Sequence, residues 1–222
     1  MITTIRDAAA GRAQHVRQRV DRPSQRRGAE RPGSRAAARA VLSGVHLRKA
    51  EDQGADVLEF TGHASVTERA YEMWDLYGPY NEVVSAGAFD ATLDRAGLDV
   101  PLVLGHDQLR RIARTTNGTL DLSVDDDGLA VVARLDPTDV DVAYIAPKLR
   151  AGLIDEMSFA FRIESGVWSP DYTEYRIDRV DLHRGDVAIV GYGANPNTDA
   201  GMRSAQPTSS RARALLELAI AR

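Results

Sequence analysis

Short stretches in which apolar and polar residues alternate run through most of this sequence, separated by turn-forming residues. A period of two places successive side chains on opposite faces of a strand, so each stretch predicts a half-buried β-strand. Helical patterns are few and short, and they do not alternate with the strands as a parallel α/β fold requires. We therefore expect the α+β class, as a β-barrel or a folded sheet with helices around it. The predicted strands cover residues 56–65, 80–84, 99–105, 111–116, 119–124, 129–135, 154–162, 172–180 and 182–190.

Three segments have helical patterns. Residues 90–96 predict a short helix ended by Gly97, and residues 139–150 predict a longer helix that Pro147 kinks or splits. Residues 212–222 predict a short amphipathic helix. It is too short to be stable alone, so it must dock on the body of the protein or on a partner.

Composition excludes several classes of function. The 222 residues suffice for one domain with extensions, and 43% hydrophobic residues can form its core. The absence of cysteine excludes disulfides, thiolate–metal sites and cysteine nucleophiles. No apolar run approaches the roughly 20 residues that span a bilayer, and residues 1–20 lack the apolar region of a signal peptide. We expect neither a membrane partner nor a metal or organic cofactor.

Charge is distributed unevenly along the chain. Residues 1–40 contain ten arginines and three acidic residues, a net charge of +7, which leaves −11 for the remainder. Residues 1–44 are poor in large apolar groups, so we predict a disordered basic arm. Three interpretations of this arm are open: an extension without a function, a segment that contacts nucleic acid or an acidic partner, and a transit peptide. The acidic body argues against nucleic-acid binding, and Asp7 and Asp21 argue against a transit peptide. Residues 45–200 then form the domain, and 201–222 form a linker with the short helix.

The acidic turn at residues 125–128 resembles part of a calcium-binding loop. An EF-hand loop with its glycine at Gly128 needs acidic ligands where Ser123 and Arg134 stand, so a plain hairpin turn is the better interpretation. His63, in the strand 56–65, is interpreted as a residue of the strand face.

One histidine and one serine are placed at predicted buried strands. The strand 99–105 leads directly into His106, and Ser158 lies within the strand 154–162. A serine hydroxyl becomes a nucleophile when a positioned base takes its proton, and histidine is the usual base. Alone, the pair is more often two satisfied polar groups at strand ends than a hydrolase site. No Gly-x-Ser-x-Gly motif surrounds Ser158, which disfavours an esterase.

Further short motifs follow one another in a fixed order. They are residues 87–89 (GAF), 106–107 (HD), 127–129 (DGL), 136–138 (DPT), 148–154 (KLRAGLI), 157–161 (MSFAF), 186–190 (DVAIV) and 194–196 (ANP). In this order and spacing they resemble the prohead (capsid-maturation) serine protease family of tailed bacteriophages, across residues 55–200. That family is related in fold to the herpesvirus assemblins. The resemblance therefore implies a mostly antiparallel β-barrel surrounded by a few short helices.

The resemblance implies a role for each candidate residue. Ser158 matches the nucleophile and His106 the general base, while Ala160 stands where the family usually has glycine. Asp186 matches the acidic residue that would hold the histidine in one tautomer. His183 is the alternative third member, because herpesvirus relatives use a second histidine. Two other acidic residues stay open for this role, Asp178 and Asp181.

The implied function is a serine endopeptidase that cleaves phage capsid or scaffold protein, and itself, during prohead maturation. It would act in the host cytoplasm, inside the assembling procapsid. Its substrate would be the major capsid protein or a scaffolding protein, and the formation of a homo-oligomer is left open. The alternative is a non-catalytic scaffolding or assembly protein on a protease-like fold. A nucleic-acid-binding module, which rests only on the arginine arm, is a third alternative.

Overall fold

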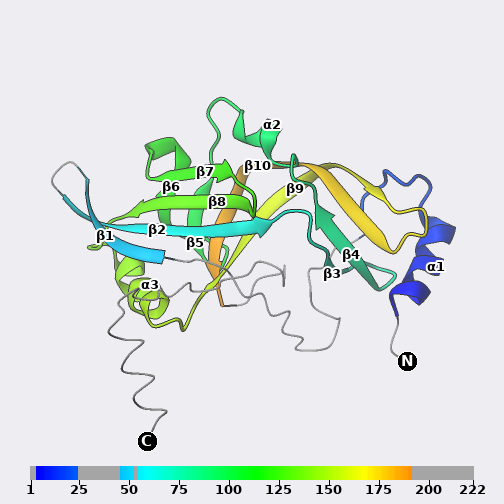
Figure 1. Ribbon diagram of the computed structural model, residues 1–222, viewed down its shortest axis with the longest axis horizontal. Coiled ribbons are helices and arrows are strands. Elements are labelled where there is room, and N and C mark those ends of the chain that lie inside the picture. Colours follow the sequence, from blue (N-terminus) through cyan, green and yellow to red (C-terminus); the bar gives the residue numbers. More distant parts are fainter. Residues whose placement is uncertain (1–3, 25–45, 53–54, 192–222) are drawn as a thin grey trace, which may run out of the picture.

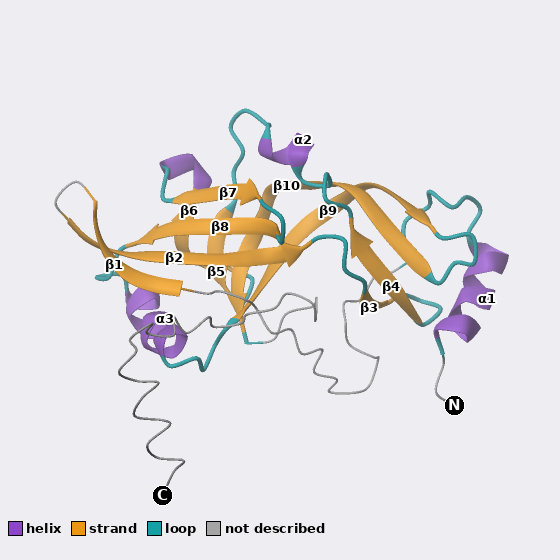
Figure 2. Cartoon of the chain, in the orientation of Figure 1, coloured by secondary structure: helices purple, strands orange, loops and turns teal. Residues whose placement is uncertain are grey.

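The computed structural model describes residues 4–24, 46–52 and 55–191, and its strands form two sheets (Figures 1 and 2). The first sheet has the strand order β1-β2-β8-β7, and all of its pairings are antiparallel. Its strands are β1 (His46–Asp52), β2 (Ala55–Val66), β7 (Leu120–Val124) and β8 (Gly128–Leu135).

The second sheet is built around one long strand, β10 (Glu174–Val190). The sheet has the order β3-β4-β10-β5-β6, and β9 also pairs with β10. The first part of β10 is parallel to β4, its last part is parallel to β5, and β9 is antiparallel to it. The other strands are β3 (Tyr71–Trp74), β4 (Pro79–Val84), β5 (Pro101–Leu104), β6 (Asp107–Arg114) and β9 (Glu156–Trp168).

The structure has the predicted α+β composition, but the predicted barrel is not confirmed. Neither sheet closes on itself, because β1 and β7 end one strand order and β3 and β6 end the other. Alternation of apolar and polar residues reveals which face of a strand is buried. It carries no information about which edges meet, and barrel closure depends on the edges.

The helices lie around the sheets: α1 (Ile5–His15) packs against β4, and α3 (Val140–Arg150) contacts β1 and β6. Figure 1 shows these two helices at opposite ends of the molecule, with α2 (Asp90–Leu93) on a third side. Helix α3 begins after Asp139, whose carboxylate accepts the first free backbone N–H groups. Pro147 lies in its last turn and does not end it. None of the helices in the described segments combines the length and apolar character needed to cross a membrane.

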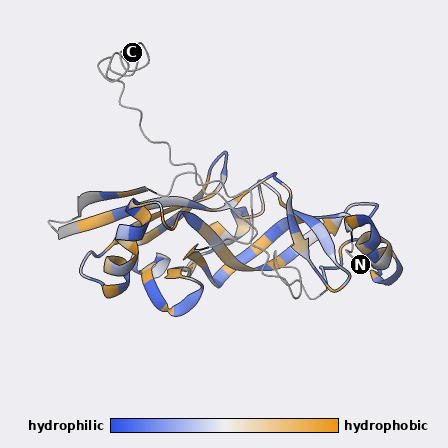
Figure 3. Ribbon diagram, turned by 90° about the horizontal axis from the view of Figure 1, so that it is seen from below, coloured by the Kyte–Doolittle hydropathy of each residue, from blue (hydrophilic) through white to orange (hydrophobic). Residues whose placement is uncertain are grey.

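Apolar side chains of both sheets share one hydrophobic core, and Figure 3 shows the alternation of hydropathy along the strands. Phe60 and Leu129 of the first sheet and Val187 and Ile189 of the second belong to it. A second, smaller group is buried on the other face of β5 and β10. It consists of Val103, Ala188 and Val190.

The N-terminal part of the chain differs from the sequence prediction. We expected disorder over residues 1–44, yet residues 4–24 form α1 and a segment that packs on the second sheet. The backbone N–H of Trp168 donates to the Arg19 carbonyl, and its indole N–H donates to the Asp21 carbonyl. Disorder is therefore the wrong prediction for residues 4–24. Residues 25–45 and the predicted helix 212–222 lie outside the described residues.

One buried side chain explains why the composition of this segment led to the wrong prediction of disorder. Arg12 is fully buried, and its guanidinium binds both carboxylate oxygens of Asp75, at 2.8 and 2.9 Å. It also donates to the carbonyls of Gly78 and Pro79 and lies over the Trp168 ring. An arginine counts as polar in any composition, but here it anchors α1 through partners that are distant in sequence.

Candidate active site

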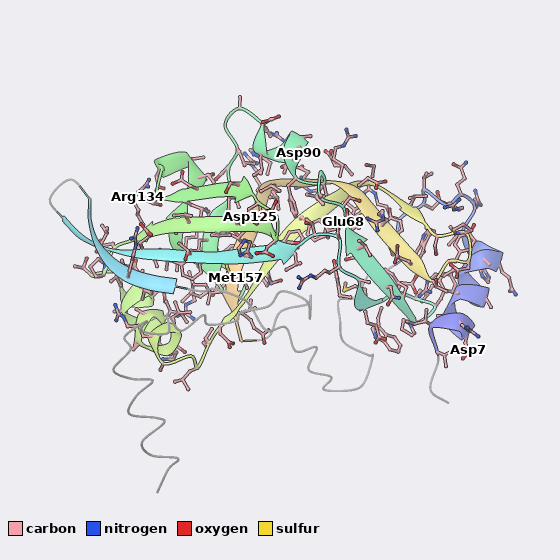
Figure 4. All side chains as sticks on the ribbon, viewed as in Figure 1. Asp7, Glu68, Asp90, Asp125, Arg134 and Met157 are labelled. Atoms are coloured by element: carbon pink, nitrogen blue, oxygen red, sulfur yellow. The ribbon has the colours of Figure 1, made fainter. Side chains whose placement is uncertain are left out.

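Three neighbouring strands carry the predicted site residues. Ser158 on β9 lies opposite Ala188 on β10, and Ala188 lies beside Val103 on β5. Paired residues point to the same face of a sheet, and so do residues two apart on one strand. Ser158 and Asp186 therefore share the face of the smaller apolar group, whereas Met157, labelled in Figure 4, is buried in the main core.

A tight turn after β5 delivers His106. Gly105 and His106 both have positive φ angles, of 62° and 59°, and the Gly105 N–H donates to the Ile189 carbonyl at 2.9 Å. A side-chain-bearing residue in this region is uncommon and costs about 1 kcal/mol or more. The turn places the imidazole Nδ1 of His106 2.6 Å from Asp186 Oδ1.

The Asp186 carboxylate accepts two hydrogen bonds. Oδ1 lies against Nδ1 of His106, and Oδ2 accepts from Nε2 of Gln108 at 2.6 Å. The Asp186 side chain is 3% exposed, and that of His106 is 38% exposed. An ionised carboxylate only accepts, so Nδ1 of His106 carries a proton, and in the neutral ring Nε2 is the free acceptor.

The structure thus joins two of the three predicted site residues directly. No hydrogen bond links Ser158 to His106 in the described part of the chain. Ser158 is half-buried on β9, with its strand partner two positions from Asp186. Contacts of this kind often tighten only when substrate binds.

The alternative third members have other partners. Nδ1 of His183 accepts the backbone N–H of Asp99 at 3.3 Å. Asp181 pairs with two arginines, at 3.2 and 3.6 Å, and Asp178 accepts from Ser85. None of these three side chains contacts His106 by a hydrogen bond, so Asp186 is the one of the four candidates that does.

A positively charged pocket of about 270 Å³ lies next to Gln108, which binds Asp186, and Gly185, which precedes it in the chain. Arg111, Arg114 and Arg184 line it together with Asp99 and Gln108. Hydrogen bonds from Arg114, at 2.6 and 2.7 Å, hold the pKa of Asp99 below its ordinary value. Sequence reasoning missed Gln108, because only the fold reveals that this side chain turns to Asp186.

A second polar cluster lies at the β7–β8 turn. The ligand atoms of His63, Asp125 and Asp127 lie within 4.8 Å of one another, which suits a metal ion. Asp125 Oδ1 accepts the N–H groups of Asp127 and Gly128, and Oδ2 lies 2.7 Å from the His63 ring. Burial acts to raise the pKa of Asp125, but these hydrogen bonds outweigh it and the pKa is lowered. The contacts are those of the predicted hairpin turn.

A histidine held in one tautomer by a buried carboxylate is part of the side-chain set that serine hydrolases use. Comparison with family models matches residues 44–211 to the caudovirus prohead serine proteases. The chain belongs to this family, as its resemblance predicted. The matched residues do not include α1. Neither the comparison with curated proteins nor that with solved structures gives a match.

Proposed function

We propose that this protein is a serine endopeptidase of prohead maturation, with Ser158 as nucleophile, His106 as general base and Asp186 as the carboxylate that orients it. Family membership supports a protease role in capsid maturation. The single observation that supports the roles of His106 and Asp186 is the 2.6 Å contact between Nδ1 of His106 and Oδ1 of Asp186. It leaves Nε2 of His106 as the proton acceptor.

The proposed reaction has two steps. Nε2 of His106 takes the Ser158 proton as Oγ attacks the scissile carbonyl, and the imidazolium then protonates the leaving amine. The C–N bond breaks and an acyl-enzyme remains. His106 next takes a proton from water as the water oxygen attacks the acyl carbon. The bond from that carbon to Oγ then breaks, the acid leaves, and the imidazolium returns its proton to Oγ of Ser158. Asp186 stabilises the imidazolium in both steps.

The substrate is proposed to be the major capsid protein or a scaffolding protein, inside the procapsid in the host cytoplasm. Co-expression of the chain with the capsid protein of its phage, followed by intact mass spectrometry, tests this. The capsid protein should be shortened with wild type and with Ser165→Ala, a control on the same strand. It should stay full length with Ser158→Ala or His106→Ala. Cleavage by a folded Ser158→Ala protein would refute the assignment.

We also propose that the enzyme cleaves itself. Residues 25–44 are rich in arginine, alanine and glycine and poor in large apolar groups, a composition suited to entering a protease site. The mass of the purified wild type should therefore be smaller than that of the Ser158→Ala protein by the mass of one or more released segments. Equal masses, apart from the substitution itself, would exclude self-cleavage.

A non-catalytic scaffolding role is the second candidate. It is favoured by two observations: Ala160 replaces the usual glycine, and Ser158 and His106 share no hydrogen bond. A serine-directed covalent probe separates the candidates. Labelling of Ser158 that disappears on denaturation indicates an enzyme, whereas an unlabelled native protein that still supports capsid assembly indicates a scaffold.

A further inference from the structure

Gln108 connects the buried carboxylate of the site to an arginine. Its Nε2 donates to Asp186 Oδ2 at 2.6 Å, and its Oε1 accepts from Nη2 of Arg111 at 3.1 Å. Nε of Arg111 also donates to the Gln108 backbone carbonyl at 2.8 Å. A chain of hydrogen bonds thus runs from Arg111 through Gln108 and Asp186 to His106.

The orientation of the Gln108 amide follows from its partners. An amide turned the other way would place its oxygen against the carboxylate and its NH₂ group against the guanidinium, and neither contact can form. Arg111 therefore selects the orientation in which Gln108 donates to Asp186. Since Oδ2 is thereby satisfied, Oδ1 is the oxygen that faces Nδ1 of His106.

The three arginines of β6 bind different partners. Arg110 binds Asp141 and Arg114 binds Asp99, each through two guanidinium nitrogens. Arg111 makes no ion pair in the described segments, and its donors are directed to Gln108. Its charge polarises the amide toward Asp186, and hydrogen bonds in such a chain strengthen one another.

We infer that Gln108 is a positioning residue of the active site: it fixes the Asp186 carboxylate in the rotamer that holds His106, and Arg111 fixes Gln108. This inference rests on the proposed protease function. Its consequence is that the orientation of the general base depends on a side chain that touches neither substrate nor the reacting atoms. Partners that orient a metal-binding histidine change activity by about 10- to 100-fold when removed, and we expect an effect at the lower end of this range for Gln108, which acts on His106 through Asp186.

Steady-state kinetics on the capsid protein tests the inference in the full chain. Gln108 is exposed at the surface, so its substitution leaves the core intact. Gln108→Glu keeps the shape but sets a second carboxylate against Asp186. It should lower kcat more than Gln108→Ala, for which about a tenfold loss is expected, while KM changes less than twofold. Arg111→Ala should lower kcat by a smaller factor.

Gln14→Ala, on the exposed face of α1, is the matched control and should behave as wild type. Wild-type kcat in Gln108→Glu would overturn the inference. So would a rise in KM at constant kcat, because that result places Gln108 in substrate binding. An unchanged kcat in Arg111→Ala would remove Arg111 from the mechanism.

A second measurement does not depend on proteolysis. In the Ser158→Ala protein, the Nδ1 proton of His106 should give a resolved downfield NMR signal because Asp186 holds it. Adding Gln108→Glu should shift and broaden that signal, while adding Gln14→Ala should not. Identical signals in all three proteins would overturn the inference. If wild type cleaves nothing but the signal responds to Gln108, the proposed function fails and the positioning role stands.

Discussion

Ser158 lies diagonally across the β9–β10 pair from Asp186, because Ser158 is opposite Ala188 and Asp186 is opposite Ala160. Diagonal neighbours on antiparallel strands are about 7–8 Å apart. An imidazole ring with one hydrogen bond of about 2.8 Å at each nitrogen spans a similar distance. The register of these strands is therefore compatible with the proposal that His106 lies between the serine and the carboxylate.

Asp186→Asn should lower kcat by about 10⁴-fold with little change in KM. The amide keeps the shape of the side chain, but its NH₂ group favours the His106 tautomer in which Nδ1 accepts and Nε2 carries the proton. That tautomer cannot take the Ser158 proton. Steady-state cleavage of the capsid protein measures the loss.

Asp178→Asn is the matched control for this change. Asp178 lies on the same strand and accepts a hydrogen bond from Ser85, away from His106. It should leave kcat within a factor of about two, as surface changes away from a site do. An Asp186→Asn enzyme with more than a tenth of wild-type kcat would remove Asp186 from the triad.

The proximity of Ser158 and Asp186 could be predicted because their strands form a hairpin, and residues 168–171 (WSPD) predict its turn. The position of His106 next to Asp186 could not be derived in the same way. It depends on the parallel pairing of β5 with β10, which are distant in sequence and share no local signal. The family resemblance supplied that part of the prediction.

Other features escaped prediction for physical reasons. Alternation predicted separate strands at 172–180 and 182–190, whereas β10 is one strand with an irregular register between Asp181 and Asp186. The irregularity interrupts the period without ending the strand. The predicted strands include none over residues 66–79, because β3 is only four residues long, too short to show a period. Arg12 and Gln108 were missed because each acts through a side chain that only the fold brings near.

Gly185→Ala should destabilise the protein and lower kcat. A Cβ at Gly185 would lie 2.0 Å from the backbone oxygen of Ala160, which is the strand partner of Asp186. Since backbone atoms cannot easily move away, we expect a loss of about 1–3 kcal/mol in the free energy of unfolding, measured in urea. Displacement of Asp186 would reduce activity as well.

Gly11→Ala provides the contrasting control. Its Cβ would meet nothing closer than Tyr77 at 3.4 Å, and alanine is the better residue inside a helix. This change should raise the free energy of unfolding by about 0.5–1 kcal/mol. Equal effects of the two substitutions would contradict the close approach at Gly185.

Tyr175→Phe should stabilise the protein by about 1 kcal/mol near neutral pH. The Tyr175 hydroxyl is buried, and it has no hydrogen-bond partner among the residues that the structure describes. Burial raises its pKa from 10.0 to about 12. Because the tyrosine ionises at lower pH in the unfolded chain, the free energy of unfolding of the wild type does not depend on this group below pH 10.0 and falls as the pH rises from 10.0 to about 12.

The phenylalanine variant has no such group, so its free energy of unfolding should fall less than that of wild type over this alkaline range. Urea unfolding at several pH values measures the difference. A parallel fall in both proteins would show that Tyr175 ionises like an exposed tyrosine.

Arg12→Ala should lower the free energy of unfolding by about 3–5 kcal/mol, because it leaves the buried Asp75 carboxylate without its cation. Arg12→Lys should restore little of this loss. A lysine cannot bind both oxygens of Asp75 and also reach the carbonyls of Gly78 and Pro79.

The double variant Arg12→Ala/Asp75→Ala separates the ion pair from the rest of the contact. It should lose less than the two single variants together, because no charge is then left buried and unpaired. Arg6→Ala, on the exposed side of α1, should change the free energy by less than about 0.5 kcal/mol. If Arg12→Ala behaves like Arg6→Ala, α1 is not part of the cooperative fold. Strict additivity in the double variant would instead show that Arg12 acts through Trp168 and the carbonyls, independently of Asp75.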